Sequence, residues 1–330
     1  MCDTRPTDSA PSRRQVLSLL LAAAPAALRA ERPLRLTVPY PAGGIVDATA
    51  RALAAPLARA LGEELVVENI PGAAGALGLQ QLLASGAEGQ VLALGTDSDT
   101  ILAPLVNPDV RLSPQQFRSL GRITSAPLAL LAGPALAGSL ATRLAEGRAG
   151  RALQLASYGV GSNAHLCAED FAQRCGVALV HVPYKGVAPL LQDLIGGHVE
   201  SAFLPLFAGV ADSVQAGKLR ALGVASAERV PRFASVPPLA EAASLSDFVH
   251  VSWSALMASA AIPEPRAVRL NQALRQVLSD AGVLAALAAA GGTVESPRGP
   301  AEARAQHEQQ TAATRRLLAQ LAARGVSLVR

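Results

Sequence analysis

The chain has 330 residues, a net charge of +4, 50% hydrophobic residues and only 16% charged residues. This length is about twice that of a usual domain, so we expect two lobes, and the apolar content excludes disorder over the main body. The small net charge, without a basic stripe or interleaved aromatic residues, excludes a nucleic-acid-binding protein.

The first 30 residues predict a cleaved export signal. Arg13 and Arg14 directly precede the apolar run Val16–Leu28, and small residues lead to Ala30 as the last residue before cleavage. This order is typical of a secretory signal, and the arginine pair favours the twin-arginine route, although Sec signals also carry arginines. The run is too short to span a bilayer, and Pro25 interrupts it. We therefore expect a periplasmic protein.

The body alternates between short apolar strands and amphipathic helices. The expected strands are Leu34–Val38, Leu65–Glu68, Val91–Leu94, Leu153–Ala156, Ala178–Val182, Ser201–Leu204 and Leu219–Val224. The expected helices are Val46–Leu61, Leu77–Leu83, Asn163–Arg174, Ala188–Ile195, Val268–Leu278 and Ala301–Ala323. Strands separated by single helices predict an α/β fold with a parallel sheet that is covered on both faces.

Two apolar segments would cross between the lobes. Leu128–Leu131 is flanked by prolines at 127 and 134, and Val249–Met257 lies after the second α/β run. Two crossings predict that residues 31–127 and 252–330 form the first lobe and that residues 128–251 form a second lobe inserted between them.

Three turns that follow predicted strands have the composition of an anion site. Pro39–Asp47 and Ser157–Asn163 place glycines just before a helix, and Gly95–Thr100 forms a polar loop. Glycine allows close approach of the backbone, and the free N–H groups and dipole of a helix N-terminus favour an anion. Any one of these turns could be an ordinary connection. Three at the carboxyl ends of parallel strands favour a binding site.

Three segments resemble the Bug-type receptors, which are the solute-binding proteins of tripartite tricarboxylate transporters. They are VPYPAGGIVDATARALAAPLARALGEELVVENIPGAAG from residue 38, HVPYKGVAPLLQDLIGGHVES at 181–201 and GKLRALGVASAERVPRFASVPPLAEA at 217–242. The resemblance runs in the same order from about residue 34 to the C-terminus. It implies a type II periplasmic-binding-protein fold of two doubly wound lobes joined by two hinge crossings. It also implies a monomer that binds a small organic acid and delivers it to membrane subunits of the transporter.

The resemblance also implies which residues form the ligand site. They are Tyr40, Ala42, Gly43, Gly44, Ile45, Asp47, Thr96 and Ser98 in the first lobe and Tyr158, Ser162, Asn163, Tyr184 and Leu204 in the second. Asp47 is placed to hold the first turn of its helix, Tyr184 could equally form the cleft wall or pack in the core, and Lys185 could be a solvated turn residue. Ser162 and Asn163 would cap the helix and offer donors.

Two departures from the family pattern bear on the ligand. Ile45 stands where family members often carry a small hydroxyl residue, and Leu204 and Pro205 stand where they often carry Asp and Asn. If both Ile45 and Leu204 face the cleft, the pocket is more apolar than usual. We therefore predict a carboxylate with an apolar or aromatic body rather than an amino acid. Ile70, in place of the usual Arg before the Pro-Gly of the second turn, is expected to affect packing.

The same residues bear on three other functions. Ser162, His165 and Asp170 lie close in sequence, as in an exported hydrolase, but no nucleophile elbow or orienting acid accompanies them. The pair Gly159-x-Gly161 lacks the third glycine of a dinucleotide site, and no cofactor is predicted. An accessory to a membrane sensor kinase would use the same fold and cleft.

The cysteines predict neither a disulfide nor a metal site. Cys2 would be lost with the signal, and Cys167 and Cys175 lie about 12 Å apart along one predicted helix, too far for a disulfide. We expect both to be buried, small apolar residues.

Overall fold

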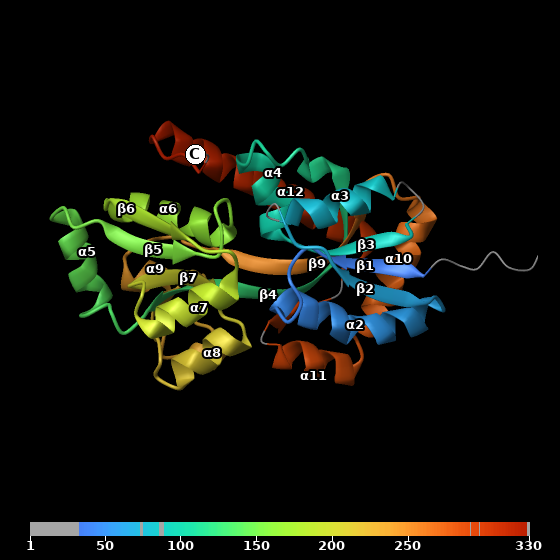
Figure 1. Cartoon of the computed structure of the whole chain (residues 1–330), viewed down its shortest axis with the longest axis horizontal. Coiled ribbons are helices and arrows are strands. Elements are labelled where there is room, and N and C mark those ends of the chain that lie inside the picture. The colour runs from blue at the N-terminus through green and yellow to red at the C-terminus, as the bar shows by residue number, and fades with distance from the viewer. Residues whose placement is uncertain (1–32, 73–74, 86–88, 291, 297, 329–330) are drawn as a thin grey trace, which may run out of the picture.

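The computed structural model describes residues 33–72, 75–85, 89–290, 292–296 and 298–328. The expected export signal at residues 1–30 lies outside these ranges. Among the described residues, ten strands form one mixed sheet in the order β2-β1-β3-β9-β4-β7-β5-β6, and β10 and β8 also pair with β4. The sheet runs through two lobes that lie side by side in Figure 1.

The first lobe holds strands from both ends of the described chain. Its strands are β1 (Leu34–Val38), β2 (Leu65–Asn69), β3 (Val91–Thr96), β9 (Val251–Ser259) and β10 (Thr293–Val294). Its helices are α2 (Ile45–Leu61), α3 (Ala76–Ala84), the π-helical turn η3 (Ser98–Leu102), α4 (Ala103–Val106), the short 3-10 turn η4 (Pro114–Gln116), α10 (Glu264–Val277), α11 (Ala281–Ala289) and α12 (Pro300–Ala323).

The second lobe is built from the middle of the chain. Its strands are β5 (Leu153–Ser157), β6 (Leu179–Pro183), β7 (Ser201–Pro205) and β8 (Arg220–Val224). Its helices are α5 (Leu140–Arg148), α6 (Asn163–Cys175), α7 (Val187–Gly196), α8 (Ala208–Gln215), the short 3-10 turn η5 (Pro231–Phe233) and α9 (Leu239–Ala242). The long strand β4 (Phe117–Ala132) belongs to both lobes: residues 117–127 pair with β9, and residues 128–132 pair with β7.

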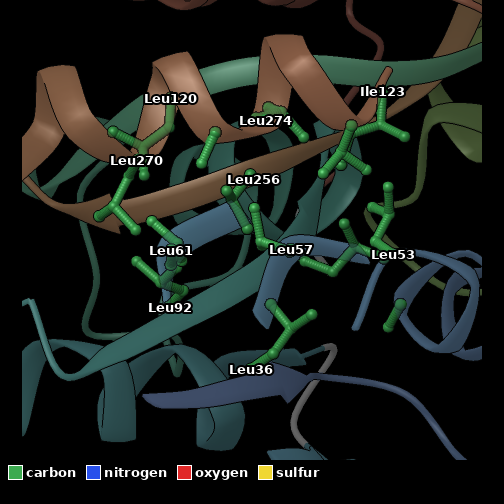
Figure 2. Close-up of a cluster of buried hydrophobic side chains, with 14 of the residues drawn as sticks. Leu36, Leu53, Leu57, Leu61, Leu92, Leu120, Ile123, Leu256, Leu270 and Leu274 are labelled. Carbon is green, nitrogen blue, oxygen red and sulfur yellow. The ribbon is translucent and has the colours of Figure 1, made fainter. Parts of the chain in front are cut away.

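Helices cover both faces of the sheet in each lobe. On one face of the first lobe, leucines of α2 and α10 meet leucines of β1, β3 and β9 in one apolar cluster (Figure 2). Leu57 and Leu270 in this cluster are fully buried, and each such side chain contributes about 1.5–3 kcal/mol to folding. The second lobe has a separate cluster on each face, with Phe171 of α6 in one and Leu190 of α7 in the other.

The structure confirms the alternating α/β plan and corrects some of its details. The strands separated by single helices are parallel, as expected, but the two crossing strands are antiparallel to their neighbours. The crossing expected at Leu128–Leu131 is the end of the 16-residue strand β4. The strand begins earlier than expected, because Gly121 and Pro127 interrupt its apolar pattern in the sequence. The loop expected at Gly95–Thr100 is wrong: β3 continues to Thr96, and η3 begins at Ser98. No helix in the described ranges is both long enough and apolar enough to cross a membrane.

Cys167 and Cys175, the cysteines among the described residues, are free thiols and are buried as expected. Burial raises the pKa of the Cys167 thiol above its usual value, so this side chain stays neutral.

Candidate functional site

A cleft of about 400 Å³ lies between the lobes. Its lining comes from the turn before α2, the turn before α7, and the crossing strands. The lining residues are Tyr40, Pro41, Ala42, Gly43, Gly44, Ile45, Val46, Thr49, Thr96, Ser98, Thr124, Tyr158, Lys185, Gly186, Val187, Ala188, Pro189, Pro205, Phe207, Ser252, Trp253 and Ser254. Helix α2 belongs to the first lobe and α7 to the second (Figure 1), and the first residues of both helices line the cleft.

The turn before α2 is held in shape by Asp47. Gly43 has a φ of 84°, which glycine adopts without strain, and its N–H donates to Asp47 Oδ2 at 2.9 Å. Arg51 Nε and Asn69 Nδ2 also donate to this carboxylate, each at 3.0 Å. Burial alone would raise the pKa of Asp47, but these hydrogen bonds outweigh it and lower the pKa below its usual value. Asp47 therefore has a structural role and does not line the cleft.

The N-terminus of α2 remains available to a ligand. No side chain caps this helix, and its first residues, Ile45 and Val46, line the cleft. Uncapped N–H groups and the helix dipole give this end a partial positive charge.

A second uncapped helix N-terminus faces the cleft from the other lobe. Gly186 is the N-cap of α7, has a φ of 118°, and has no side-chain capping bond. Its own N–H donates to Tyr158 O at 3.1 Å, which ties this turn to the one after β5. The residues from Gly186 to Pro189 were not expected to line the cleft, although Tyr184 was. The signal was present, because a glycine before an apolar helix is the same pattern that marked Gly43 and Gly44.

The cleft lining is mainly apolar and carries one positive charge. Lys185 is the only charged side chain among the described residues of the lining, and it is exposed. Most of the wall is apolar, from Ile45 and Val46 on one side to Val187, Pro205 and Phe207 on the other. An anionic group at the helix ends would thus have its remaining body against hydrocarbon.

Three buried polar atoms in the cleft wall have no hydrogen-bond partner in the described structure. They are Thr49 Oγ1, Tyr158 OH and Trp253 Nε1. Buried polar atoms in proteins are nearly always paired, so unpaired atoms that gather around one cleft indicate a place where a ligand or ordered water supplies the partner.

Two buried carboxyl groups lie behind the first-lobe wall. Asp99 Oδ1 accepts from Thr96 N at 2.8 Å, Asp99 Oδ2 has no partner in the described structure, and burial raises the pKa of Asp99 to about 7. The Thr96 hydroxyl is also 2.9 Å from the Tyr40 hydroxyl at the cleft surface. Asp97 Oδ1 accepts from Ser252 Oγ and Trp253 N, and burial raises the pKa of Asp97 to about 6.

The structure brings together eight of the predicted site residues. Those on the cleft lining are Tyr40, Ala42, Gly43, Gly44, Ile45, Thr96, Ser98 and Tyr158. Ile45 thus faces the cleft, and Lys185 lines it instead of being only a solvated turn residue.

Ser162 and Asn163 lie outside the cleft lining. The Ser162 hydroxyl accepts from His165 N at 3.3 Å, so Ser162 caps α6 as expected. Asn163 N donates to Ser98 Oγ at 3.2 Å, and Asn163 Nδ2 donates to Val251 O at 3.1 Å. The Asn163 bonds therefore join α6 to the first lobe.

Tyr184 and Leu204 also lie outside the cleft lining. The Tyr184 hydroxyl donates to Asp193 Oδ2 at 2.7 Å, and burial raises the pKa of this tyrosine to about 12. Leu204 is fully buried in the apolar cluster between β7 and α7. Because side chains alternate along a strand, Leu204 points to the core, and the neighbouring Pro205 lines the cleft.

The residues considered for a hydrolase do not assemble into a triad. His165 Nδ1 accepts from Gly161 N at 3.2 Å, the Ser162 hydroxyl faces the backbone of α6, and Asp170 Oδ2 lies 3.0 Å from His250 Nε2. The described residues contain no cluster of three or more His, Cys, Asp or Glu side chains that could hold a metal ion.

Comparison with known proteins identifies the family. The family described as tripartite tricarboxylate transporter family receptor (TctC) matches residues 49–321. The chain belongs to this family. Protein BugT of Bordetella pertussis is 34% identical over 266 residues, which cover 79% of this chain and 81% of BugT.

Solved receptors share the fold of this TctC family member. The periplasmic binding protein BugD is 27% identical, with a TM-score of 0.77, over 90% of this chain and 99% of BugD. MatC from Rhodopseudomonas palustris, solved with malate, is 26% identical with a TM-score of 0.78 over 87% and 99% of the two chains. An R. palustris protein solved with adipate is 26% identical with a TM-score of 0.79 over 89% and 99%. The chain therefore has the fold of periplasmic solute-binding proteins.

Proposed function

We propose that this receptor captures a small carboxylate with an apolar or aromatic body in the periplasm and delivers it to the membrane subunits of a tripartite tricarboxylate transporter. The observation that carries the proposal is the cleft itself, in which two uncapped helix N-termini and Lys185 meet apolar walls. The relatives solved with malate and with adipate support a carboxylate ligand.

The lining favours an apolar acid over an amino acid. An α-ammonium group would need a buried carboxylate as its partner, and the described lining contains no Asp or Glu side chain. Ile45, Val187 and Phe207 offer instead a surface for methylene groups or an aromatic ring. Adipate, with four methylenes between its carboxylates, is a suitable first probe.

Lobe closure on the ligand would use the two crossing strands. We propose lobe boundaries at 31–127 with 252–330 and at 128–251, and a monomeric working form. The switch of β4 from β9 to β7 between residues 127 and 128 supports this division. Bending β4 and β9 at this point would bring the turns before α2 and α7 together over the ligand.

A thermal-shift and calorimetric screen tests the ligand class. Adipate, malate, benzoate, L-aspartate and L-glutamate would be titrated separately, and a bound ligand must raise the melting temperature by mass action. We expect adipate or benzoate to give the largest shift. Tight binding of L-aspartate or L-glutamate that depends on the amino group would exclude the apolar-acid assignment.

The chain's two lysines provide a matched pair for testing the site. Lys185→Met removes the charge at the cleft, whereas Lys218→Met removes the same charge from an exposed position outside it. We expect adipate affinity to fall about tenfold for Lys185→Met, because a hydrogen bond to a charged group contributes about 1.5–3 kcal/mol. Lys218→Met should change it less than twofold. Equal losses in both variants would contradict the proposed site.

Export and delivery need cellular measurements. N-terminal sequencing of the periplasmic fraction should find a mature chain that starts near residue 31, and a retained leader would contradict cleavage. Uptake of labelled ligand should be lost when the receptor is deleted. Normal uptake with loss of a ligand-dependent transcriptional response would assign the receptor to sensing rather than transport.

A further inference from the structure

A second hollow in the first lobe, distinct from the ligand cleft, gathers unpaired arginines. It is an open surface hollow of about 570 Å³ between β4, the segment before α12, and α12 itself. Arg122 comes from β4, Arg298 from the connecting segment, and Arg316 from α12.

The three guanidinium groups have no carboxylate partner in the described structure. Several other arginines do pair with carboxylates, such as Arg118 with Glu264 and Arg304 with Glu308. Among the described residues, Arg122, Arg298 and Arg316 form no salt bridge, although Arg122 Nη2 lies 3.5 Å from Gln310 Oε1.

The nearby acidic groups only partly offset this charge. Glu302 is the one described carboxylate on the lining, and its Oε2 accepts from Gly299 N at 3.1 Å. Burial lowers the pKa of Arg122, the charges of Glu295 and Asp97 act against this, and the positive charge of Arg298 lowers it further. The lining itself therefore carries three arginines against one glutamate, while Glu295 and Asp97 act on Arg122 from outside the lining.

Arg122 is also held in a fixed orientation. Its guanidinium carbon lies 4.6 Å from the ring centroid of Trp253, which is a cation–π contact, and Trp253 lines the ligand cleft. Arginine forks that are fixed in this way favour oxyanions that accept two parallel hydrogen bonds.

We infer that the hollow formed by Arg122, Arg298 and Arg316 is a second binding site, for a small multivalent oxyanion of the phosphate class. The amide side chains of Gln306, Gln309 and Gln310, which also line the hollow, add uncharged hydrogen-bonding groups around it. Because Arg122 contacts the Trp253 ring, an anion bound to this arginine would change the environment of the indole.

The single tryptophan makes the inference directly testable. Because Trp253 is the only tryptophan of the chain, its emission reports on binding beside Arg122. Inorganic pyrophosphate, titrated into the full mature protein at low ionic strength, should shift this emission with a saturable curve. Arg298→Gln and Arg316→Gln should each weaken pyrophosphate binding about tenfold, because charge-assisted bonds to the oxyanion are lost.

Two control variants separate binding in this hollow from binding elsewhere on the protein. Arg315→Gln removes the same charge one residue away, where the side chain lines a different hollow, and should change pyrophosphate affinity less than twofold. Lys185→Met should also leave it unchanged, since pyrophosphate in the ligand cleft would need this lysine.

The remaining outcomes overturn the inference. They are a linear, non-saturable response, an equal loss in Arg315→Gln, or a loss in Lys185→Met. Binding seen only with phosphatidylglycerol vesicles, or only with poly-glutamate, would likewise exclude a free small oxyanion as the ligand.

Discussion

The turns before α2 and α6 have the same local design but different environments. Each follows a parallel strand, precedes a helix, and contains a glycine with positive φ: 84° at Gly43 and 70° at Gly161. The turn before α2 lines the cleft with an uncapped helix end. In the turn before α6, Gly161 N donates to His165 Nδ1, Ser162 caps the helix, and Asn163 N donates to Ser98. Composition thus identifies a helix N-terminus, while tertiary contacts decide whether its donors are free.

The strongest test of this comparison places a negative charge at the open turn. Ile45→Asp should weaken adipate binding at least about a hundredfold, because the carboxylate would occupy the region that favours an anion. Aspartate is well tolerated in the first turn of a helix, so the variant should fold. Calorimetric titration, with a melting curve of the unliganded variant, checks both statements. Unchanged adipate affinity in a folded Ile45→Asp protein would show that the ligand does not bind at this turn.

Glycine-to-alanine changes in the two turns should separate open space from close packing. A Cβ on Gly161 would lie 2.8 Å from Val106 Cγ2, whereas a Cβ on Gly43 would meet nothing within 4 Å. Both changes strain a left-handed backbone by about 1 kcal/mol, but Gly161→Ala adds overpacking of about 1–3 kcal/mol. Urea denaturation should therefore show a larger loss for Gly161→Ala. Equal losses would mean that Val106 moves freely and that the lobes are not packed tightly there.

Two buried aspartates, one in each lobe, also differ in whether their carboxylate oxygens have hydrogen-bond partners. Asp99, behind the open turn, has an Oδ2 without a partner in the described structure, whereas Asp170 Oδ2 lies 3.0 Å from His250 Nε2. Since the pKa of Asp99 is raised to about 7 from 3.8, the folded state binds a proton more tightly than the unfolded state. This contribution to stability is therefore present below about pH 4 and is lost as pH rises through about 7.

Asp99→Asn should remove that loss of stability. The variant should exceed the wild type by at least about 1 kcal/mol at pH 8, and the difference should shrink as pH falls toward 5, because asparagine carries no proton to lose. Urea denaturation at several pH values measures the difference. A constant difference across this range would assign the pH dependence to another group.

Sequence patterns predicted most of the elements, because strand and helix periodicities here are local. They also identified the turn before α2 through its adjacent glycines. The family resemblance placed Leu204 and Asn163 at the ligand site. Here the Leu204 side chain points to the core face of β7, and Asn163 bonds to Ser98 and Val251 in distant segments. Sequence patterns did not predict that Lys185 would line the cleft, although the glycine that follows it precedes an apolar helix, as Gly43 and Gly44 do.

The smallest expected effect on ligand binding is that of a change in the turn before α6. Ser162→Ala removes the cap of α6 and should lower the free energy of unfolding by about 1 kcal/mol. Adipate affinity should change less than twofold, since the hydroxyl accepts from His165 N and lies outside the cleft lining. Paired denaturation and calorimetry on one preparation measure both quantities. If the free energy of adipate binding fell by more than the free energy of unfolding, the turn before α6 would belong to the ligand site. The lobes would then have to rearrange on binding so that the N-terminus of α6 reaches the acid.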